Sequence, residues 1–429
     1  MKTVGVLTDF YGEPDPAYSL CRVAGNQLKM LLRAGYKPVL IADQAFCPTS
    51  YPWNAVEEIR YLPGLPRWNE IKIHETWNED LAKMTSAMES AVSGLDIVLT
   101  HDLIYQPAQL LHNMAARAVA KEHPEIHWLH LIHSATTPAI LSSRDAYLRL
   151  AHEKFPNSFI LFPNEYSIPR VARNFHVEED EVKCVHHAVD WCESKKYEEE
   201  TAQLIDAKRM LQADVIGCYP IRLDRGKQVE FPIRIFAQLK RLWKSVRLVI
   251  VDFHSTGGDK VLYRKELHML GERLGLSGDE LIFTSEYKEA WEVRVPHEVV
   301  MDLMDLSNVY IHSSRSETYS LTTQEAGISR SFLVLNRDFP PTRSIYGEWP
   351  VYFQFGSNID ALTGLDGDTH TEYHPSVEQY CYDIAMRIAY ELKYNRVLAE
   401  EAFLRKNRNL DSVFRNELEP LLYAFDDIL

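Results

Sequence analysis

The chain has 429 residues, of which 46% are hydrophobic and 25% are charged, and its formal net charge is −15. At about 150 residues per domain, this length predicts two or three domains, each with its own core. The composition excludes a disordered or collagen-like chain. The negative charge argues against a protein that coats nucleic acid by neutralising its phosphates, although it is compatible with a local basic groove.

Targeting signals and cysteine usage indicate the compartment. Asp9 interrupts the first apolar run before any cleavage-site pattern, and no uncharged stretch approaches the roughly 18 apolar residues of a membrane helix. Six cysteines are scattered without a CxxC pair, which is typical of reduced thiols. We therefore expect a cytoplasmic protein with no transmembrane segment. The cysteines are Cys21, Cys47, Cys184, Cys192, Cys218 and Cys381.

Short apolar runs alternate with helical patterns along the whole chain. The strand candidates are Thr3–Thr8, Lys37–Ala42, Asp96–Thr100, Trp128–Ile132, Ser158–Phe162, Glu181–Val185, Asp214–Tyr219, Val246–Val251, Glu280–Thr284, Asn308–His312 and Ser331–Leu335. Strands separated by helices predict βαβ units and a mostly parallel sheet covered on both faces. The last segment, Ser376–Phe425, has apolar residues at helical spacing and is expected to be largely helical.

The series of strands divides into two halves. Between them lies the polar stretch Glu193–Glu200, which either marks a domain boundary or begins a solvated helix. We predict an α/β fold with two doubly wound, Rossmann-like domains facing each other across a cleft. The predicted parts are an N-terminal domain (1–192), a linker or helix (193–212), a C-terminal domain (213–400) and a final helical segment (401–429) that packs back on the N-terminal domain.

The strongest local motif is the segment 313–327, which follows a predicted strand and places Glu317 and Glu325 eight residues apart. Thr322 with Glu325 fits a capping box, so a helix is expected to begin near Leu321 or Thr322. Backbone N–H groups between two acids form a plausible cradle for an anion. The alternative is that Glu325 only caps the helix and Glu317 is a solvated loop acid.

A second motif is basic and follows the first strand of the second half. Arg222, Arg225 and Lys227 lie between a predicted strand and a helical run, within a window (201–250) that carries ten Lys/Arg and four Asp/Glu. Arg offers a planar fork to a phosphate and Lys a mobile charge. The loop after the first strand of a doubly wound sheet is where such folds bind phosphates. The alternative is a basic surface loop.

Together the two motifs resemble those of the retaining, nucleotide-sugar-dependent glycosyltransferases of the GT-B fold, family-four type. Glu317 and Glu325 match that family's E-x7-E motif. Arg222, Leu223 and Lys227 match its G-R-L-x-x-x-K-G motif, with Ile221 and Gln228 in place of the two glycines. Three more segments resemble the family: the strand ending in His101, the strand ending near His133, and Val185–Asp190, which is similar to V-x-x-G-V-D.

The resemblance implies roles for individual residues on the donor side. It implies that Arg222 and Lys227 bind the donor diphosphate and stabilise it as it leaves, and that Glu317 contacts the hydroxyls of the transferred sugar. Glu325 would bind the ribose, and the backbone of Ser320, Leu321 and Thr322 would approach the phosphates. Ser320 stands where the family usually has glycine.

On the other side, the resemblance implies that His133 lies near the sugar and the reacting centre. It also places Gly12 and His101 on the acceptor side, although Gly12 stands in a loop that differs from the family's Gly-Gly turn. The implied donor is a nucleotide-diphosphate sugar, a UDP- or GDP-sugar, with no obligatory cofactor and no metal. The only D-x-D, Asp366 to Asp368, is interpreted as a turn.

The expected activity is that of a hexosyltransferase that retains the anomeric configuration. No second acid is evident, so same-face attack by the acceptor hydroxyl is favoured over Glu317 as a covalent nucleophile. Three alternatives stay open at this point. They are an acceptor that is a modified DNA base or a protein, an epimerase-like protein that binds the nucleotide sugar without transfer, and a catalytically silent scaffold.

Overall fold

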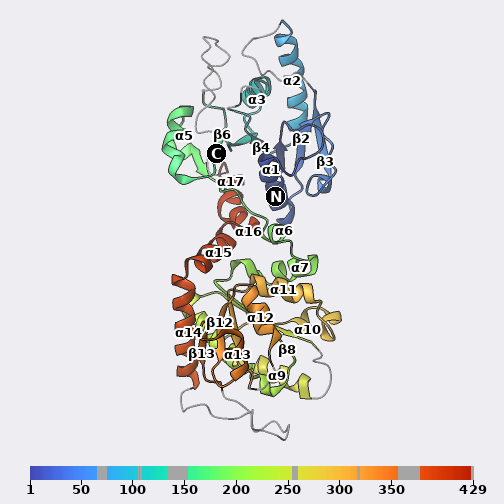
Figure 1. Cartoon of the computed structure of the whole chain (residues 1–429). Coiled ribbons are helices and arrows are strands. Elements are labelled where there is room, and N and C mark those ends of the chain that lie inside the picture. The colour runs from blue at the N-terminus through green and yellow to red at the C-terminus, as the bar shows by residue number, and fades with distance from the viewer. Residues whose placement is uncertain are drawn as a thin grey trace. The chain divides into compact units, whose positions relative to one another are not determined.

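The computed structural model describes residues 1–64, 75–104, 106, 109–133, 153–253, 259–315, 319–355 and 377–426. The chain divides into two units, each with its own parallel sheet (Figure 1). Unit 1 comprises Met1–Asp190 and Arg408–Leu429, and unit 2 comprises Trp191–Asn407. None of the described helices is long and apolar enough to cross a membrane.

Unit 1 contains a seven-stranded parallel sheet in the order β3-β2-β1-β4-β5-β6-β7. Its strands are β1 (Val4–Leu7), β2 (Val39–Asp43), β3 (Glu58–Leu62), β4 (Ile97–His101), β5 (His127–Leu131), β6 (Ser158–Phe162) and β7 (Val182–Cys184). Its helices are α1 (Ser19–Arg33), α2 (Trp77–Val92), α3 (Leu110–Glu122), α5 (Ile168–Phe175), α16 (Leu410–Val413) and α17 (Glu419–Leu422), with short 3-10 turns at Trp53–Ala55, Glu165–Ser167 and Glu179–Glu181.

Alternate strand residues of unit 1 enter two different cores, because successive side chains of a strand point to opposite faces. Leu7 and Val98 pack with residues of α2, α3 and α5, whereas Val6 and Leu99 pack with α1 and the C-terminal helices. Two buried faces explain why these strands are continuous apolar runs in the sequence.

The C-terminal segment belongs to the second of these cores. Leu410, Phe414, Leu418 and Leu422 are buried there, and Val189 pairs with Asn409 in an isolated parallel bridge. Figure 1 shows α16 and α17 as the last helices, and α16 contacts α1. The turn Phe414–Leu418 between them is π-helical. The predicted return of C-terminal helices to the N-terminal part is therefore confirmed.

Unit 2 contains a six-stranded parallel sheet in the order β10-β9-β8-β11-β12-β13. Its strands are β8 (Val215–Ile221), β9 (Val246–Asp252), β10 (Leu281–Phe283), β11 (Val309–His312), β12 (Phe332–Asn336) and β13 (Val351–Phe353). Its helices are α6 (Trp191–Lys195), α7 (Glu199–Ala207), α8 (Glu230–Trp243), α9 (Asp259–Arg273), α10 (Thr284–Tyr287), α11 (His297–Leu306), α12 (Leu321–Ile328), α13 (Pro340–Tyr346), α14 (Val377–Tyr394) and α15 (Arg396–Asn407), with 3-10 turns at Met210–Gln212, Arg225–Lys227 and Glu289–Glu292.

All eleven predicted strands are present within a residue or two of their predicted bounds, and the predicted α/β class with two doubly wound parallel sheets is confirmed. Two strands, β3 and β13, were not predicted. Both lie at an edge of their sheet, and most of their residues are partly exposed. The polar stretch 193–200 is helical at both ends, in α6 and α7.

Candidate functional site

The two sequence motifs of unit 2 follow neighbouring strands at the centre of its sheet. The strand order runs outward in one direction from β8 to β10 and in the other from β11 to β13. This reversal between β8 and β11 is a topological switch point, where open α/β sheets bind ligands outside the carboxyl ends of the strands. The loop 222–228 leaves β8 and the loop 313–315 leaves β11, so both motifs begin at the switch point.

Direct hydrogen bonds hold these two loops together. The Arg315 backbone N–H donates to the Gly226 carbonyl over 2.9 Å. The Ser313 hydroxyl oxygen lies 3.1 Å from the Lys227 carbonyl oxygen and 3.0 Å from that of Gln228. The backbone of Lys227 is therefore held by Ser313, the first residue of the other motif, and not by its own loop alone.

Gln228 completes this connection from a buried position. Its Nε2 donates to the Ser313 carbonyl over 2.8 Å and to the Phe355 carbonyl over 2.6 Å. Its backbone is left-handed, with φ = 51°, a conformation that glycine adopts far more readily. The family that the sequence resembles has glycine at this position. Here the side chain joins three segments, and this gives the substitution a structural reason.

The cations of the loop have different partners. The Arg225 guanidinium lies 2.8 Å from Glu266 and 4.8 Å from the centroid of the Tyr263 ring, so it is bound to α9. Arg222 is more exposed, with its Nε 3.6 Å from Asp224. Lys227 is partly exposed and ends the 3-10 turn. Arg222 and Lys227 therefore keep accessible surface at the switch point, whereas Arg225 serves mainly to anchor the loop.

The second motif leads into α12. Ser320 is the N-cap residue and has φ = 76°, again where the resembled family has glycine. Leu321 begins the helix, as predicted. Within the described residues, the side chain of Ser320 accepts no hydrogen bond from the first-turn amides of α12. Its Oγ lies 2.7 Å from Oγ1 of Thr323 instead. The amides of the first turn thus lack a side-chain cap from Ser320, which suits anion binding.

The predicted capping box is wrong, because Thr322 lies inside the helix and is not its N-cap. Its hydroxyl lies 3.0 Å from that of Tyr310 instead. Glu325 is also inside α12; its side chain is 26% exposed, and its Oε1 lies 3.9 Å from Nε2 of His297. Glu317 lies outside the described residues.

Unit 1 has its own switch point, between β1 and β4. Gly12 lies in the loop after β1 and His101 ends β4. Gly12 has φ = 70°; its N–H donates to the Ala45 carbonyl over 2.9 Å and its carbonyl accepts from the Cys47 N–H over 2.8 Å. The structure thus places both predicted acceptor-side residues at the position where doubly wound sheets bind ligands.

Three histidines form a row beside this point. Nδ1 of His101 lies 3.0 Å from Nε2 of His133, and Nδ1 of His133 lies 3.0 Å from Nε2 of His187. The His133 backbone N–H donates to the Asp102 carboxylate over 2.9 Å. Burial lowers the pKa of His101 to about 3 and that of His133 to about 2, so both rings are neutral at pH 7. His187, at the other end of the row, is exposed.

Sequence reasoning missed the part that several residues play in these sites, although it had named Gln228 as a replaced glycine and had placed Ser313 in the segment 313–327. Gln228, Ser313 and Asp102 each stand next to a residue that was singled out, and His187 lies within the segment similar to V-x-x-G-V-D. Nothing in the sequence indicated these side-chain bonds, because they join residues 31 to 127 positions apart.

No protein-family pattern matches the chain, and no curated protein matches its sequence. Several solved structures align with it along its full length. HepE from Anabaena, in complex with UDP, is 14% identical, with 98% of this chain and 99% of that chain covered, at a TM-score of 0.33. A glycosyltransferase from Rickettsia africae is 12% identical, with 99% and 98% covered and a TM-score of 0.35. Sucrose-phosphate synthase from Thermosynechococcus elongatus is 14% identical, with 100% of both chains covered and a TM-score of 0.36.

With scores this low, these similarities add nothing to the assignment of the sites. The class of protein is defined by the chain's own elements. It has two doubly wound parallel sheets, each with marked residues at its switch point, and a C-terminal segment that returns to the first unit. These are the elements of the GT-B architecture.

Proposed function

We propose that this protein is a retaining glycosyltransferase that moves a sugar from a nucleotide-diphosphate donor, a UDP- or GDP-sugar, to an acceptor hydroxyl. One observation carries the proposal. The loop with Arg222 and Lys227 and the loop that leads to Glu317 and Glu325 are bonded to each other at the switch point of unit 2. These bonds support the proposal that the two motifs serve one site.

The chemistry that this site can perform follows from its charges. Breaking a sugar–diphosphate bond builds negative charge on the departing phosphate. Arg222, Lys227 and the first-turn amides of α12 would stabilise that charge without reorganisation, which is the largest single contribution in many enzymes. Glu317 would bind the sugar hydroxyls and Glu325 the ribose. No step requires a bound metal.

The row of histidines changes which residue we expect to contact a substrate on the acceptor side. Both ring nitrogens of His133 lie within hydrogen-bond distance of another histidine, so a contact with the sugar requires one of these partners to be exchanged. His187 is the exposed member. In this proposal, neutral His133 orients His187 toward the acceptor side, and His101 supports it from the buried end.

The test begins with binding and ends with stereochemistry. Thermal shift against UDP-, GDP- and ADP-sugars identifies the donor, since a ligand present at about 100 times its dissociation constant adds about 2.7 kcal/mol of stability. Proton NMR of the first-formed product then assigns the anomer. An α-linked product from an α-linked donor supports the proposal, and a β-linked product would overturn retention. Donor consumption without transfer to any hydroxyl would favour the epimerase-like alternative.

A matched pair of variants tests the basic loop. Lys227→Ala is expected to lower turnover by about 10²–10³, the typical loss on removing one preorganised electrostatic contact. Lys265→Ala, at an exposed position on α9 of the same unit, is the control and should retain full turnover. Equal activity of the two variants would remove the loop from the donor site.

A further inference from the structure

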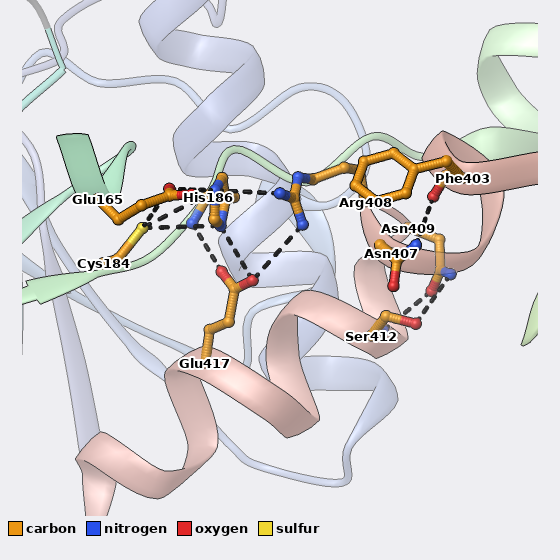
Figure 2. Close-up of polar contacts among 9 residues, drawn as sticks. All are labelled: Glu165, Cys184, His186, Phe403, Asn407, Arg408, Asn409, Ser412 and Glu417. Carbon is orange, nitrogen blue, oxygen red and sulfur yellow. Dashed lines mark hydrogen bonds and ion pairs between the residues drawn. The ribbon is translucent and has the colours of Figure 1, made fainter. Parts of the chain in front are cut away.

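A separate cluster of side chains lies in unit 1, on residues that the proposed transfer does not use. It joins Glu165 in the turn after β6, Cys184 at the end of β7 and His186 in the loop that follows (Figure 2). Their ligand atoms approach closely. The Cys184 Sγ lies 3.8 Å from Nε2 of His186 and 3.8 Å from Oε2 of Glu165, and the last two atoms are 3.3 Å apart.

We assign the tautomer of His186 from Arg408 and Glu417, which lie at its two ring nitrogens; a third neighbour, Oε2 of Glu165, lies 3.3 Å from Nε2. Nη2 of Arg408 lies 3.1 Å from Nε2 of His186, and because arginine can only donate, Nε2 carries a lone pair. Nδ1 therefore carries the proton and donates to Oε1 of Glu417 over 3.0 Å. The other oxygen of Glu417 accepts the His186 backbone N–H over 2.7 Å. Figure 2 shows Glu417 reaching the ring from the C-terminal segment, and Sγ of Cys184 lies 3.7 Å from the same Nδ1.

This arrangement is that of a histidine prepared to bind a metal. Metal-binding histidines almost always donate their second ring N–H to a carboxylate or carbonyl, which orients the ring and raises the basicity of the free nitrogen. Glu417 performs that function here, and it does so from a π-helical turn, a local irregularity that is frequent at functional sites.

We propose that Glu165, Cys184 and His186 bind a divalent transition-metal ion of the Zn²⁺ type, with the fourth position left to water or another ligand. Tetrahedral Zn²⁺ with sulfur at about 2.3 Å and nitrogen or oxygen at about 2.0–2.2 Å requires donor atoms about 3.3–3.6 Å apart. The separations of Oε2 of Glu165 from Nε2 and from Sγ, 3.3 and 3.8 Å, lie within a few tenths of an ångström of these values. Sγ of Cys184 lies 3.7 Å from Nδ1 of His186 as well as 3.8 Å from Nε2, so this side chain has to turn toward the Nε2 side when the metal binds.

The charges balance when the metal is bound. Cys184 binds as a thiolate and releases its proton to solvent. The thiolate, Glu165 and Glu417 then carry three negative charges in total. These are balanced by the two positive charges of the metal ion and the single positive charge of Arg408. Arg408 leaves Nε2 of His186 to the metal and keeps its ion pair with Glu417, whose Oε1 is 3.8 Å from Nη1.

The proposed metal would connect the sheet of unit 1 to its C-terminal segment. Glu165 and Cys184 belong to β6, β7 and their exits, whereas Glu417 holds His186 from the turn 414–418. Because binding of the metal to the folded chain alone stabilises it, the metal should raise the unfolding temperature of this unit.

The experiment uses the full chain after treatment with a chelator, with Co²⁺ as the spectroscopic probe and Zn²⁺ as its competitor. The expected result is a thiolate-to-cobalt charge-transfer band that saturates at one equivalent and is abolished by Zn²⁺. Cys184→Ser should lose the band, whereas the control Cys47→Ser, at an exposed cysteine outside the cluster, should keep it. Glu417→Gln should weaken binding by about 10–100-fold.

A second measurement uses the wild-type chain, so that its result does not depend on whether the variants fold. In the wild-type chain, Zn²⁺ should protect Cys184 from alkylation, as read by mass spectrometry, and leave Cys47 reactive as the internal control. Absence of the band and of this protection would overturn the proposal, as would a band that persists in Cys184→Ser. Since no residue of the donor motifs takes part, a metal-free result would leave the proposed transferase function unaffected.

Discussion

Gln228 offers a direct test of how the donor loop is built, because its backbone and its side chain have opposite preferences. The left-handed φ of 51° favours glycine, whereas the side-chain amide donates to the buried carbonyls of Ser313 and Phe355. Gln228→Gly removes the backbone strain and both hydrogen bonds together. Gln228→Ala removes the hydrogen bonds and keeps the strain.

The magnitudes follow from these two effects. Two hydrogen bonds at about 0.5–1.5 kcal/mol each contribute about 1–3 kcal/mol, and the loss tends to the upper part of this range where buried carbonyls are left without a partner. The left-handed conformation costs a non-glycine residue about 1 kcal/mol. We therefore expect Gln228→Ala to lose about 2 kcal/mol of unfolding free energy and Gln228→Gly about 1 kcal/mol, so that wild type is the most stable of the three.

Urea denaturation of the three proteins provides the measurement, and Arg330 supplies the control. Arg330 is exposed in the same unit and also left-handed, with φ = 62°. Arg330→Gly should be more stable than Arg330→Ala by about 1 kcal/mol and at least as stable as wild type. A Gln228→Gly protein that is more stable than wild type would refute the bridging role of the side chain. Equal stability of the Gly and Ala variants of Gln228 would refute the backbone argument.

Three further predictions concern other parts of the two sites. Ser320→Gly should change the unfolding free energy by less than about 1 kcal/mol, because relief of its left-handed backbone offsets one lost hydroxyl contact, and nucleotide affinity measured by calorimetry should not fall. Stability should decrease as pH falls below about 6.5, since His101 and His133 stay neutral in the folded chain while the unfolded chain takes up protons. At pH 5.5 each contributes a loss of about 1.4 kcal/mol, and a scanning-calorimetry transition unchanged between pH 7 and 5.5 would contradict this. Glu317→Gln should impair transfer far more than nucleotide binding, and a parallel loss of both would remove it from the sugar side of the site.

The sequence by itself determined the layers of this protein. Strands with two buried faces must be continuous apolar runs, and these runs identified the eleven central and outer strands correctly. The two missed strands, Glu58–Leu62 and Val351–Phe353, lie at sheet edges. Glu58–Leu62 mixes charged and apolar residues, and Val351–Phe353 is apolar but only three residues long, which is a weak pattern in the sequence. Motif spacing likewise singled out Arg222 and Lys227, because the fold places the loop after its first strand at a predictable point.

Only the tertiary structure decided how these residues are held. Gln228 reads in the sequence as a replaced glycine, and its function as a donor to Ser313 and Phe355 exists only once β8 and β11 lie side by side. The sequence assigned His133 only through its resemblance to a family motif, and the structure shows that it is the middle of a row whose members come from the ends of three different strands. Side-chain hydrogen bonds depend on distances between segments far apart in the chain, and a linear pattern of hydrophobicity carries no information on those distances.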